Sequence, residues 1–112
     1  MSGGIHEVMI PIPITYYKKG IRNNYYVTNT GDIYEVSLNG TKHKLKIYLD
    51  SKKRPYVYMK NMTDTNTVRY RLAPLVWNVF NGYNSEVSRS FKYNYRDNNP
   101  MNCTLSNIIV KM

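Results

Sequence analysis

The fold depends on one apolar stretch, LAPLVWNVF at positions 72–80. Its Leu, Val and Phe side chains recur at i, i+3, i+4, i+7 and i+8, which is the spacing of one face of an α-helix. Pro74 falls in the first turn, where a missing backbone N–H costs little, and Asn81-Gly82 is a typical helix end. The stretch therefore predicts one short helix with its apolar face in the core.

The residues before this helix predict antiparallel strands. Residues 25–28 and 33–38 are rich in Tyr, Val and Ile and flank a turn at 29–32, so they predict a hairpin. Residues 56–60 and 67–71 have the same character and complete an antiparallel meander.

Residues 44–49 follow the turn signal Asn39-Gly40 and alternate strictly between apolar and polar side chains. A strand places alternate side chains on opposite faces. The segment therefore predicts one buried face and one basic, solvent-facing face. The buried face would carry Leu45, Ile47 and Leu49, and the basic face Lys44, Lys46 and Tyr48.

The two ends of the chain differ from the middle. Residues 1–20 predict an extended N-terminal arm, because Pro11 and Pro13 exclude a central strand and favour a sheet edge. After the helix, an alternating segment at 88–96 and the apolar run at 107–110 predict two more strands. We expect an α+β protein, with the arm at 1–20 and a single α+β domain at 21–112.

The charge is strongly unbalanced. Lys and Arg number 16 against 7 Asp and Glu, which gives a net charge of +9 and an isoelectric point near 9.7. Tyr is also abundant, at 12 of 112 residues. A folded basic domain of this kind is expected to meet a negatively charged partner.

Several classes of site are excluded or disfavoured by the same counts. Cys103 is the single cysteine, so an internal disulfide and a Cys-rich zinc site are excluded, and a small buried side chain is expected. His6 and His43 lack spaced partners, so we expect solvated side chains and no metal or cofactor. No apolar run is long enough to span a bilayer and no secretory signal is evident, which predicts a cytoplasmic protein without membrane contact.

Three segments resemble the phage-type HNH homing endonucleases, in the order and spacing of that family. Residues 25–33, YYVTNTGDI, resemble the family's YxVSNxGRV, and residues 72–80 resemble its VHRLVAEAF helix. Residues 97–108, DNNPMNCTLSNI, resemble DGNPLNNRLENL, which follows the catalytic histidine. The resemblance covers about residues 20–112. It implies an HNH-like α+β domain that ends in a truncated ββ element, and it implies DNA rather than RNA as the target.

The chain departs from the family where the family does chemistry. The resemblance implies a water-activating histidine, a neighbouring metal-holding side chain and asparagines that complete the site. Those positions are occupied here by Asn94, Tyr95, Cys103 and Asn107. A phenol is a poor general base near neutral pH, because its ordinary pKa is about 10. The sequence therefore predicts a degenerate endonuclease that is not an enzyme and holds no metal.

The function predicted from the sequence is nucleic-acid binding through backbone contacts, most simply to DNA. Lys and Arg neutralise phosphates, while Tyr can hydrogen-bond phosphates or stack on bases, although many of the tyrosines would simply pack the sheet. The candidate binding residues are Lys44, Lys46, Lys52, Lys53, Arg54, Lys60, Arg69, Arg71, Arg89, Lys92 and Arg96.

An alternative from a different class stays open. A small phage-encoded protein with this fold could be an inhibitor or anti-defence protein that binds a host protein or nucleoprotein in the host cytoplasm. Tyr, Trp and Arg are common in such interfaces. Without a covering helix, Ile108, Ile109 and Val110 would also need a partner, which predicts a homodimer. A third alternative, an active enzyme of another type, would recruit Tyr95 and Cys103.

Overall fold

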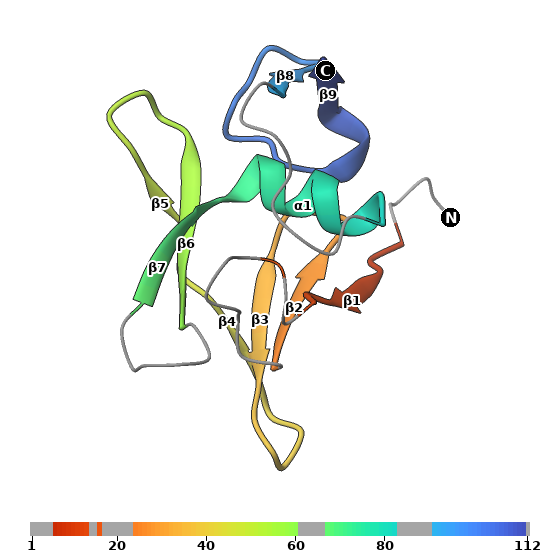
Figure 1. Cartoon of the computed structure of the whole chain (residues 1–112), viewed down its shortest axis with the longest axis vertical. Helices are drawn as coiled ribbons and strands as arrows, with labels where there is room; N and C mark the ends of the chain where they lie inside the picture. Colours follow the sequence, from red (N-terminus) through yellow and green to blue (C-terminus); the bar gives the residue numbers. More distant parts are fainter. Residues whose placement is uncertain (1–5, 14–15, 17–23, 61–66, 83–90, 112) are drawn as a thin grey trace.

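A computed structural model describes residues 6–13, 16, 24–60, 67–82 and 91–111. It is an α+β fold in which three small antiparallel sheets surround one helix (Figure 1). The predicted fold class is thereby confirmed, although the single predicted meander is divided among separate sheets. The elements are β1 (Met9–Pro11), β2 (Tyr25–Thr28), β3 (Ile33–Val36), β4 (Lys42–Lys44), β5 (Tyr48–Leu49), β6 (Pro55–Lys60), β7 (Thr67–Arg71), α1 (Leu72–Phe80), β8 (Lys92–Tyr95), the 3-10 turn η1 (Leu105–Asn107) and β9 (Ile108–Lys111).

The first sheet has the order β1-β2-β3-β4, and each pair is antiparallel. The strand β1 lies at the edge of this sheet, and its Pro11 is opposite Tyr26. Proline has no backbone N–H to donate, and an edge strand can lack this donor without a loss of hydrogen bonds inside the sheet. Just after it, Ile12 is 2 % exposed and belongs to the same core as Val27 and Ile33. The predicted edge position is confirmed, whereas the division of the chain at residue 20 stays a prediction because residues 17–23 lie outside the described part.

The predicted continuous strand at 44–49 is wrong. The strand β4 ends at Lys44, and β5 begins at Tyr48 in the second sheet. Between them, the Leu45 N–H donates to the Ile33 carbonyl at 2.9 Å, the last bond to the first sheet. Because the chain passes from one sheet to the other here, alternate side chains no longer share a face. Leu45 is half-buried, while Ile47 and Leu49 are 36 % and 49 % exposed.

The second sheet has the order β5-β6-β7 and buries one of its faces. Along β6 the side chains alternate, so that Val57 and Met59 are fully buried. Opposite them, Val68 and Tyr70 of β7 face the same side. The neighbouring residues on both strands therefore face outward.

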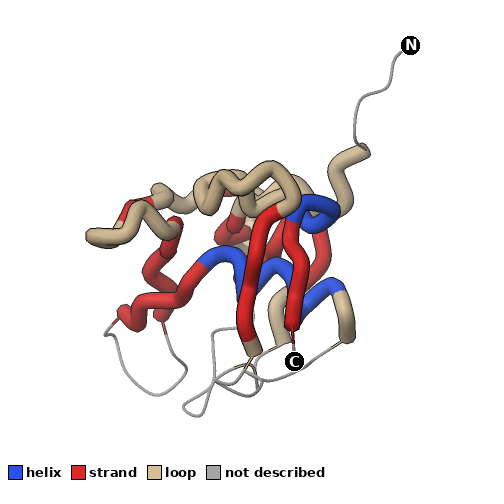
Figure 2. The backbone as a smooth tube through the Cα atoms, turned by 90° about the horizontal axis from the view of Figure 1, so that it is seen from above, coloured by secondary structure: helices blue, strands red, loops and turns tan. Residues whose placement is uncertain are grey.

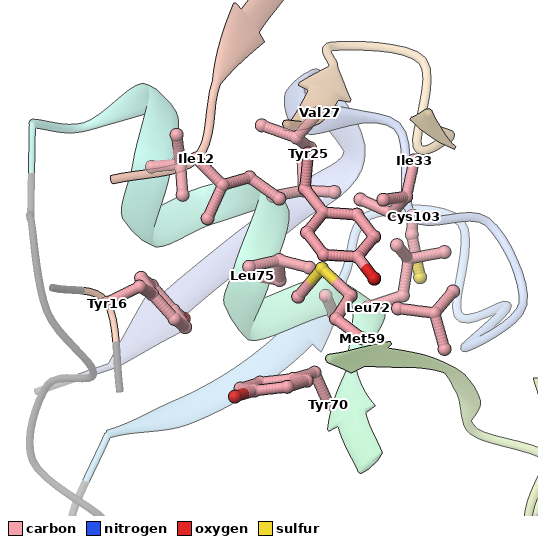
Figure 3. Close-up of a cluster of buried hydrophobic side chains, with 14 of the residues drawn as sticks. Ile12, Tyr16, Tyr25, Val27, Ile33, Met59, Tyr70, Leu72, Leu75 and Cys103 are labelled. Carbon is pink, nitrogen blue, oxygen red and sulfur yellow. The ribbon is translucent and has the colours of Figure 1, made fainter. Parts of the chain in front are cut away.

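The helix α1 forms at the predicted residues and joins the sheets to the C-terminal hairpin. Leu72, Leu75, Val76 and Val79 are buried in the common core, as the helical spacing predicts. Leu72 and Leu75 lie among core side chains of the sheets (Figure 3). Each such side chain contributes about 1.5–3 kcal/mol by leaving water. Seen from above, the helical segments run among the strands (Figure 2). No described helix is long and apolar enough to cross a membrane.

The C-terminal strands β8 and β9 form an antiparallel hairpin whose loop spans residues 96–107. Ile108 is 5 % exposed within the chain itself, and Val110 packs against the core. The expectation that the last strand is uncovered is therefore wrong at Ile108, because this side chain is part of the hydrophobic core. Ile109 and Val110 are half-buried, and the homodimer stays a prediction.

Gly31 holds the β2–β3 turn against the loop of the C-terminal hairpin. Its φ is +91°, and a Cβ at this position would lie 3.0 Å from the Cys103 carbonyl oxygen. Beside it, the Leu105 N–H donates to the Asn29 carbonyl at 2.8 Å. Only a residue without a side chain allows this approach, so the turn fixes where the hairpin loop sits.

We expect Gly31→Ala to destabilise the protein more than Gly40→Ala. Both glycines have a positive φ, so each alanine costs about 1–2 kcal/mol of backbone strain. Only Gly31 also meets backbone atoms of Cys103, whereas nothing lies within 4 Å of a Cβ at Gly40. Urea unfolding should show an additional loss of about 1 kcal/mol for Gly31→Ala. Equal losses would show that the turn and loop can separate without cost.

Candidate functional site

The outward side of the second sheet carries tyrosines and cations. The register places Tyr48 opposite Tyr56, Tyr56 opposite Arg71, and Tyr58 opposite Arg69. Directly opposed residues share a face, and so do residues two apart along one strand. We call this surface the Tyr–Arg face, and it comprises Tyr48, Tyr56, Tyr58, Lys60, Arg69 and Arg71.

The rings of the Tyr–Arg face contact one another. Tyr48 and Tyr56 stack with centroids 5.6 Å apart, and Tyr58 meets both rings edge-on at 5.4 and 5.5 Å. The Arg69 guanidinium lies 3.9 Å from the Tyr56 centroid, and the Lys46 ammonium lies 5.2 Å from that of Tyr48. The hydrogen bond from Arg69 lowers the pKa of the Tyr56 phenol, whereas the bond with Tyr56 raises the pKa of Tyr58.

One end of the Tyr–Arg face reaches a second group of polar side chains. Arg71 ends β7 and is half-buried, and Tyr95 ends β8. Arg71 Nε and Tyr95 Oη are both buried without a hydrogen-bond partner among the described residues. Burial raises the pKa of the Tyr95 phenol, assisted by Cys103 and opposed by the charge of Arg71. The phenol is therefore protonated at neutral pH and can donate a hydrogen bond.

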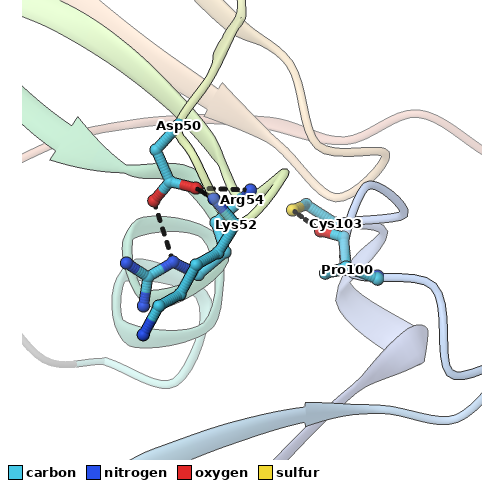
Figure 4. Close-up of polar contacts among 5 residues, drawn as sticks. All are labelled: Asp50, Lys52, Arg54, Pro100 and Cys103. Atoms are coloured by element: carbon cyan, nitrogen blue, oxygen red, sulfur yellow. Dashed lines mark hydrogen bonds and ion pairs between the residues drawn. The ribbon is translucent and has the colours of Figure 1, made fainter.

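Cys103 lies beside the same group, and its thiol does not ionise readily. It is 4 % exposed, and its Sγ lies 3.7 Å from the Pro100 carbonyl oxygen (Figure 4). Burial raises the pKa of its thiol to about 12, although Arg71 acts in the opposite direction. A thiolate is the form that attacks or binds metals, so burial disfavours both reactions at neutral pH. The expectation of a small buried side chain at Cys103 is confirmed.

The turn between β5 and β6 brings further cations to this end of the sheet. Asp50 accepts from the Arg54 Nε at 2.8 Å and from the backbone N–H of Lys52 at 2.9 Å (Figure 4). These bonds, led by the one from the Arg54 backbone N–H, lower the pKa of the Asp50 carboxyl. Arg54 is thus held by Asp50, while Lys52 and Lys53 are exposed.

Asp97 organises the loop between β8 and β9. Its carboxylate accepts from the side-chain amides of Asn102 at 2.8 Å and Asn107 at 2.9 Å, and from the Asn99 N–H at 2.9 Å. These bonds lower the pKa of the carboxyl, with Asn102 contributing most. In return, Asn107 Oδ1 accepts from the Asp97 N–H at 3.2 Å. The loop is therefore closed by a network of side-chain and backbone bonds.

The structure brings only part of the predicted binding set together. Lys46, Lys60, Arg69 and Arg71 lie on or beside the Tyr–Arg face, with the turn residues Lys52, Lys53 and Arg54 at its Arg71 end. The other predicted residues lie elsewhere or have local partners. Lys44 is 3.6 Å from Asp32, Arg96 donates to the Ser106 carbonyl, Lys92 is exposed on β8, and Arg89 lies outside the described residues.

The positions that the resemblance assigned to the family's site do not form one cluster. Asn94 is exposed and precedes Tyr95 on β8, so the two side chains face opposite sides. Asn107 is buried, and both ends of its amide are bonded within the Asp97 loop. The described residues contain no group of three or more His, Cys, Asp or Glu that could hold a metal. The assignment of these positions to the family's site therefore stays a prediction.

Two features of the site are not in the predicted set. The first is the contact of three tyrosine rings, although the alternation of Tyr56, Tyr58 and Lys60 along β6 gives a signal for it. The second is the role of Asp97, whose partners lie five and ten residues away. Nothing in the local sequence indicates those bonds.

The chain resembles a known protein in its fold. No family model and no curated protein matches it. Its fold is similar to a solved structure of the HNH homing endonuclease I-HmuI that describes DNA binding and cleavage, with a TM-score of 0.67 and 19 % identity. The similarity covers 94 % of this chain and 52 % of that one, so this chain spans about half the length of the matched structure.

This comparison corrects one prediction from the sequence. The prediction that the chain is not an enzyme is contradicted, because the fold it shares is that of an endonuclease. The prediction rested on the type of side chain at a few positions, chiefly Tyr95. The similarity to an HNH fold is itself in agreement with the resemblance in the sequence, whereas the correspondence of single motif positions is untested.

We expect Asp97→Asn to lower stability at neutral pH and to flatten its pH dependence. The pKa of the carboxyl is lowered in the folded state, so the charged form stabilises the fold. That stabilisation is present above the unfolded pKa of about 4 and is lost as the pH falls through the folded pKa. Urea midpoints should differ most near neutral pH and converge in acid.

The comparison has an internal control. Asp50 also has a lowered pKa, but it is present in both proteins, so its titration cancels in the difference. A difference in midpoint that does not change with pH would contradict a role for the Asp97 charge.

Proposed function

We propose that this chain binds DNA, with the sugar–phosphate backbone held along the Tyr–Arg face and the adjoining turn at 50–54. The observation that carries the proposal is the gathering of Lys46, Lys60, Arg69 and Arg71 on one side of the second sheet. The fold supports it, because the similar solved structure is that of a protein that binds and cleaves DNA.

The charge balance favours a polyanion. The chain carries a net charge of +9, and the nearest carboxylate in the turn, Asp50, is already paired with Arg54. Lys46 and Arg69 lie over tyrosine rings, which orient the cations without neutralising them. A backbone neutralised at about six phosphates gives a steep loss of affinity with salt.

Arg71 and Tyr95 supply hydrogen-bond donors at one end of the face. Arg71 Nε and Tyr95 Oη have no partner among the described residues, and leaving such groups unpaired is costly. The phenol is protonated because its pKa is raised. A phosphate offers several acceptor oxygens. Because both atoms are buried in the unbound chain, we propose that the two side chains turn outward when a phosphate binds.

The helix is not available for reading base edges. Six of its nine residues are buried, and they include Leu72, Val76 and Val79. A recognition helix must present several side chains to the major groove. We therefore propose contacts to the backbone with low sequence preference.

The alternative partner named from the sequence, a host or defence protein, stays a prediction, as does the cytoplasmic location. A pull-down from lysate treated with nuclease addresses it, because a protein target survives the digestion and a nucleic-acid bridge does not. Supercoiled plasmid incubated with Mg²⁺ or Mn²⁺ measures cleavage separately from binding.

We expect Lys52→Glu to weaken binding to duplex DNA by about five- to tenfold and to reduce the salt slope by about 1. Lys52 is exposed at the turn beside the Tyr–Arg face. The matched control is Lys42→Glu, which changes the net charge equally on β4 of the first sheet. Mobility shifts at several salt concentrations measure both quantities.

The control should bind within about twofold of the wild type. Equal losses for Lys42→Glu and Lys52→Glu would show that net charge alone matters and that the footprint is elsewhere. Failure of the wild type to bind any DNA at low salt would overturn the proposed function.

A further inference from the structure

We propose that the Tyr–Arg face stacks on unpaired bases, so that single-stranded DNA is its preferred ligand and Tyr58 is the principal contact. The inference rests on the proposed function and deepens it, because it concerns which form of DNA this surface recognises. Its basis is the arrangement of three rings and two cations on one exposed sheet face.

The three rings hold one another in place. Tyr48 and Tyr56 are nearly parallel, with 23° between their planes, whereas Tyr58 is close to perpendicular to both, at 72° and 86°. Backbone pairing fixes Tyr48 opposite Tyr56 and Tyr58 opposite Arg69. Because the rings are held by neighbours and by the sheet, little side-chain freedom remains to be lost when a ligand binds.

The rings are also exposed. Tyr48 and Tyr58 are 38 % and 40 % accessible, and both belong to the small set of large apolar side chains exposed in the described residues. The cations are distributed unevenly among them: Lys46 lies over Tyr48 and Arg69 over Tyr56. Tyr58 is the most exposed of the three rings, and the two described cations lie over the other two, which makes it the ring best placed to receive a stacked base.

The chemistry of the surface selects the ligand. An aromatic face pairs with another flat π-system, and the flanking Lys46 and Arg69 require that the ligand be anionic. In duplex DNA the bases stack on each other and present only their edges to the grooves. Only an unpaired base can lay its face on Tyr58 while its phosphates reach the two cations. The same contacts do not depend on base identity, because every base has a π-face.

The experiment separates stacking from charge. Fluorescence anisotropy at fixed salt compares three labelled probes of about 12 nucleotides, an oligothymidylate, an abasic oligomer of the same charge, and a duplex. We expect the wild type to bind oligothymidylate about tenfold more tightly than the abasic oligomer. Tyr58→Ala should lower the affinity for oligothymidylate to that of the abasic oligomer, whereas Tyr58→Phe should retain the preference.

A second variant controls for the loss of any tyrosine. Tyr34→Ala removes a half-buried ring on the first sheet that also lies near a lysine, with the Lys44 ammonium 5.8 Å from its centroid. We expect this variant to keep the preference for oligothymidylate. Circular dichroism of each variant establishes that the protein is folded.

The outcomes distinguish the two proposals. If the wild type binds none of the three probes, the proposed function fails. If it binds DNA without preferring oligothymidylate to the abasic oligomer, or if Tyr58→Ala keeps the preference, DNA binding stands and the stacking inference is overturned. A preference lost equally in Tyr34→Ala would also overturn it, because the effect would then not belong to the Tyr–Arg face.

Discussion

The register between β6 and β7 is the constraint on which the rest of the structure depends. It pairs Val57 with Tyr70 and Met59 with Val68, which sends these four side chains inward to α1. The same pairing sets Tyr56 opposite Arg71 and Tyr58 opposite Arg69 on the other side. A shift of one residue in either strand would exchange the two faces, burying cations and exposing the core. The core and the candidate interface are therefore two consequences of one set of backbone hydrogen bonds.

The helix and the strands that flank it could be predicted because their patterns are local. Residues 67–71 and 72–80 form the predicted strand and helix with the predicted bounds, since a period of two changes there to a period near 3.6. Residues 44–49 could not be predicted in the same way. Their alternation is as regular as that of any strand in the chain. However, the backbone leaves one sheet at Leu45 and joins another at Tyr48, because the strands with which it pairs are distant in sequence.

In the candidate site, too, features set by the local sequence could be predicted, and features set by tertiary packing could not. The basic character and the tyrosines could be predicted from composition, and the alternation along β6 indicates that Tyr56 and Tyr58 share a side. The bonds around Asp97 and the unpaired donors of Arg71 and Tyr95 depend on tertiary packing, and no spacing in the sequence encodes them. Enzymatic activity was the property predicted least well from the sequence. The residue types at the family positions led to the prediction that the chain is not an enzyme, which the similarity to an endonuclease fold contradicts.

The buried amide of Asn78 has a consequence for how the chain loses its structure. Its Nδ2 donates to the Tyr16 hydroxyl at 3.0 Å, and its Oδ1 accepts from the Tyr93 hydroxyl at 3.3 Å. One side chain in the middle of α1 thus joins a residue near the beginning of the chain to a strand near its end. Fraying at either terminus would leave a buried polar group unsatisfied at the centre, which makes partial opening costly. We expect the two termini to melt cooperatively with the helix, as a single unit.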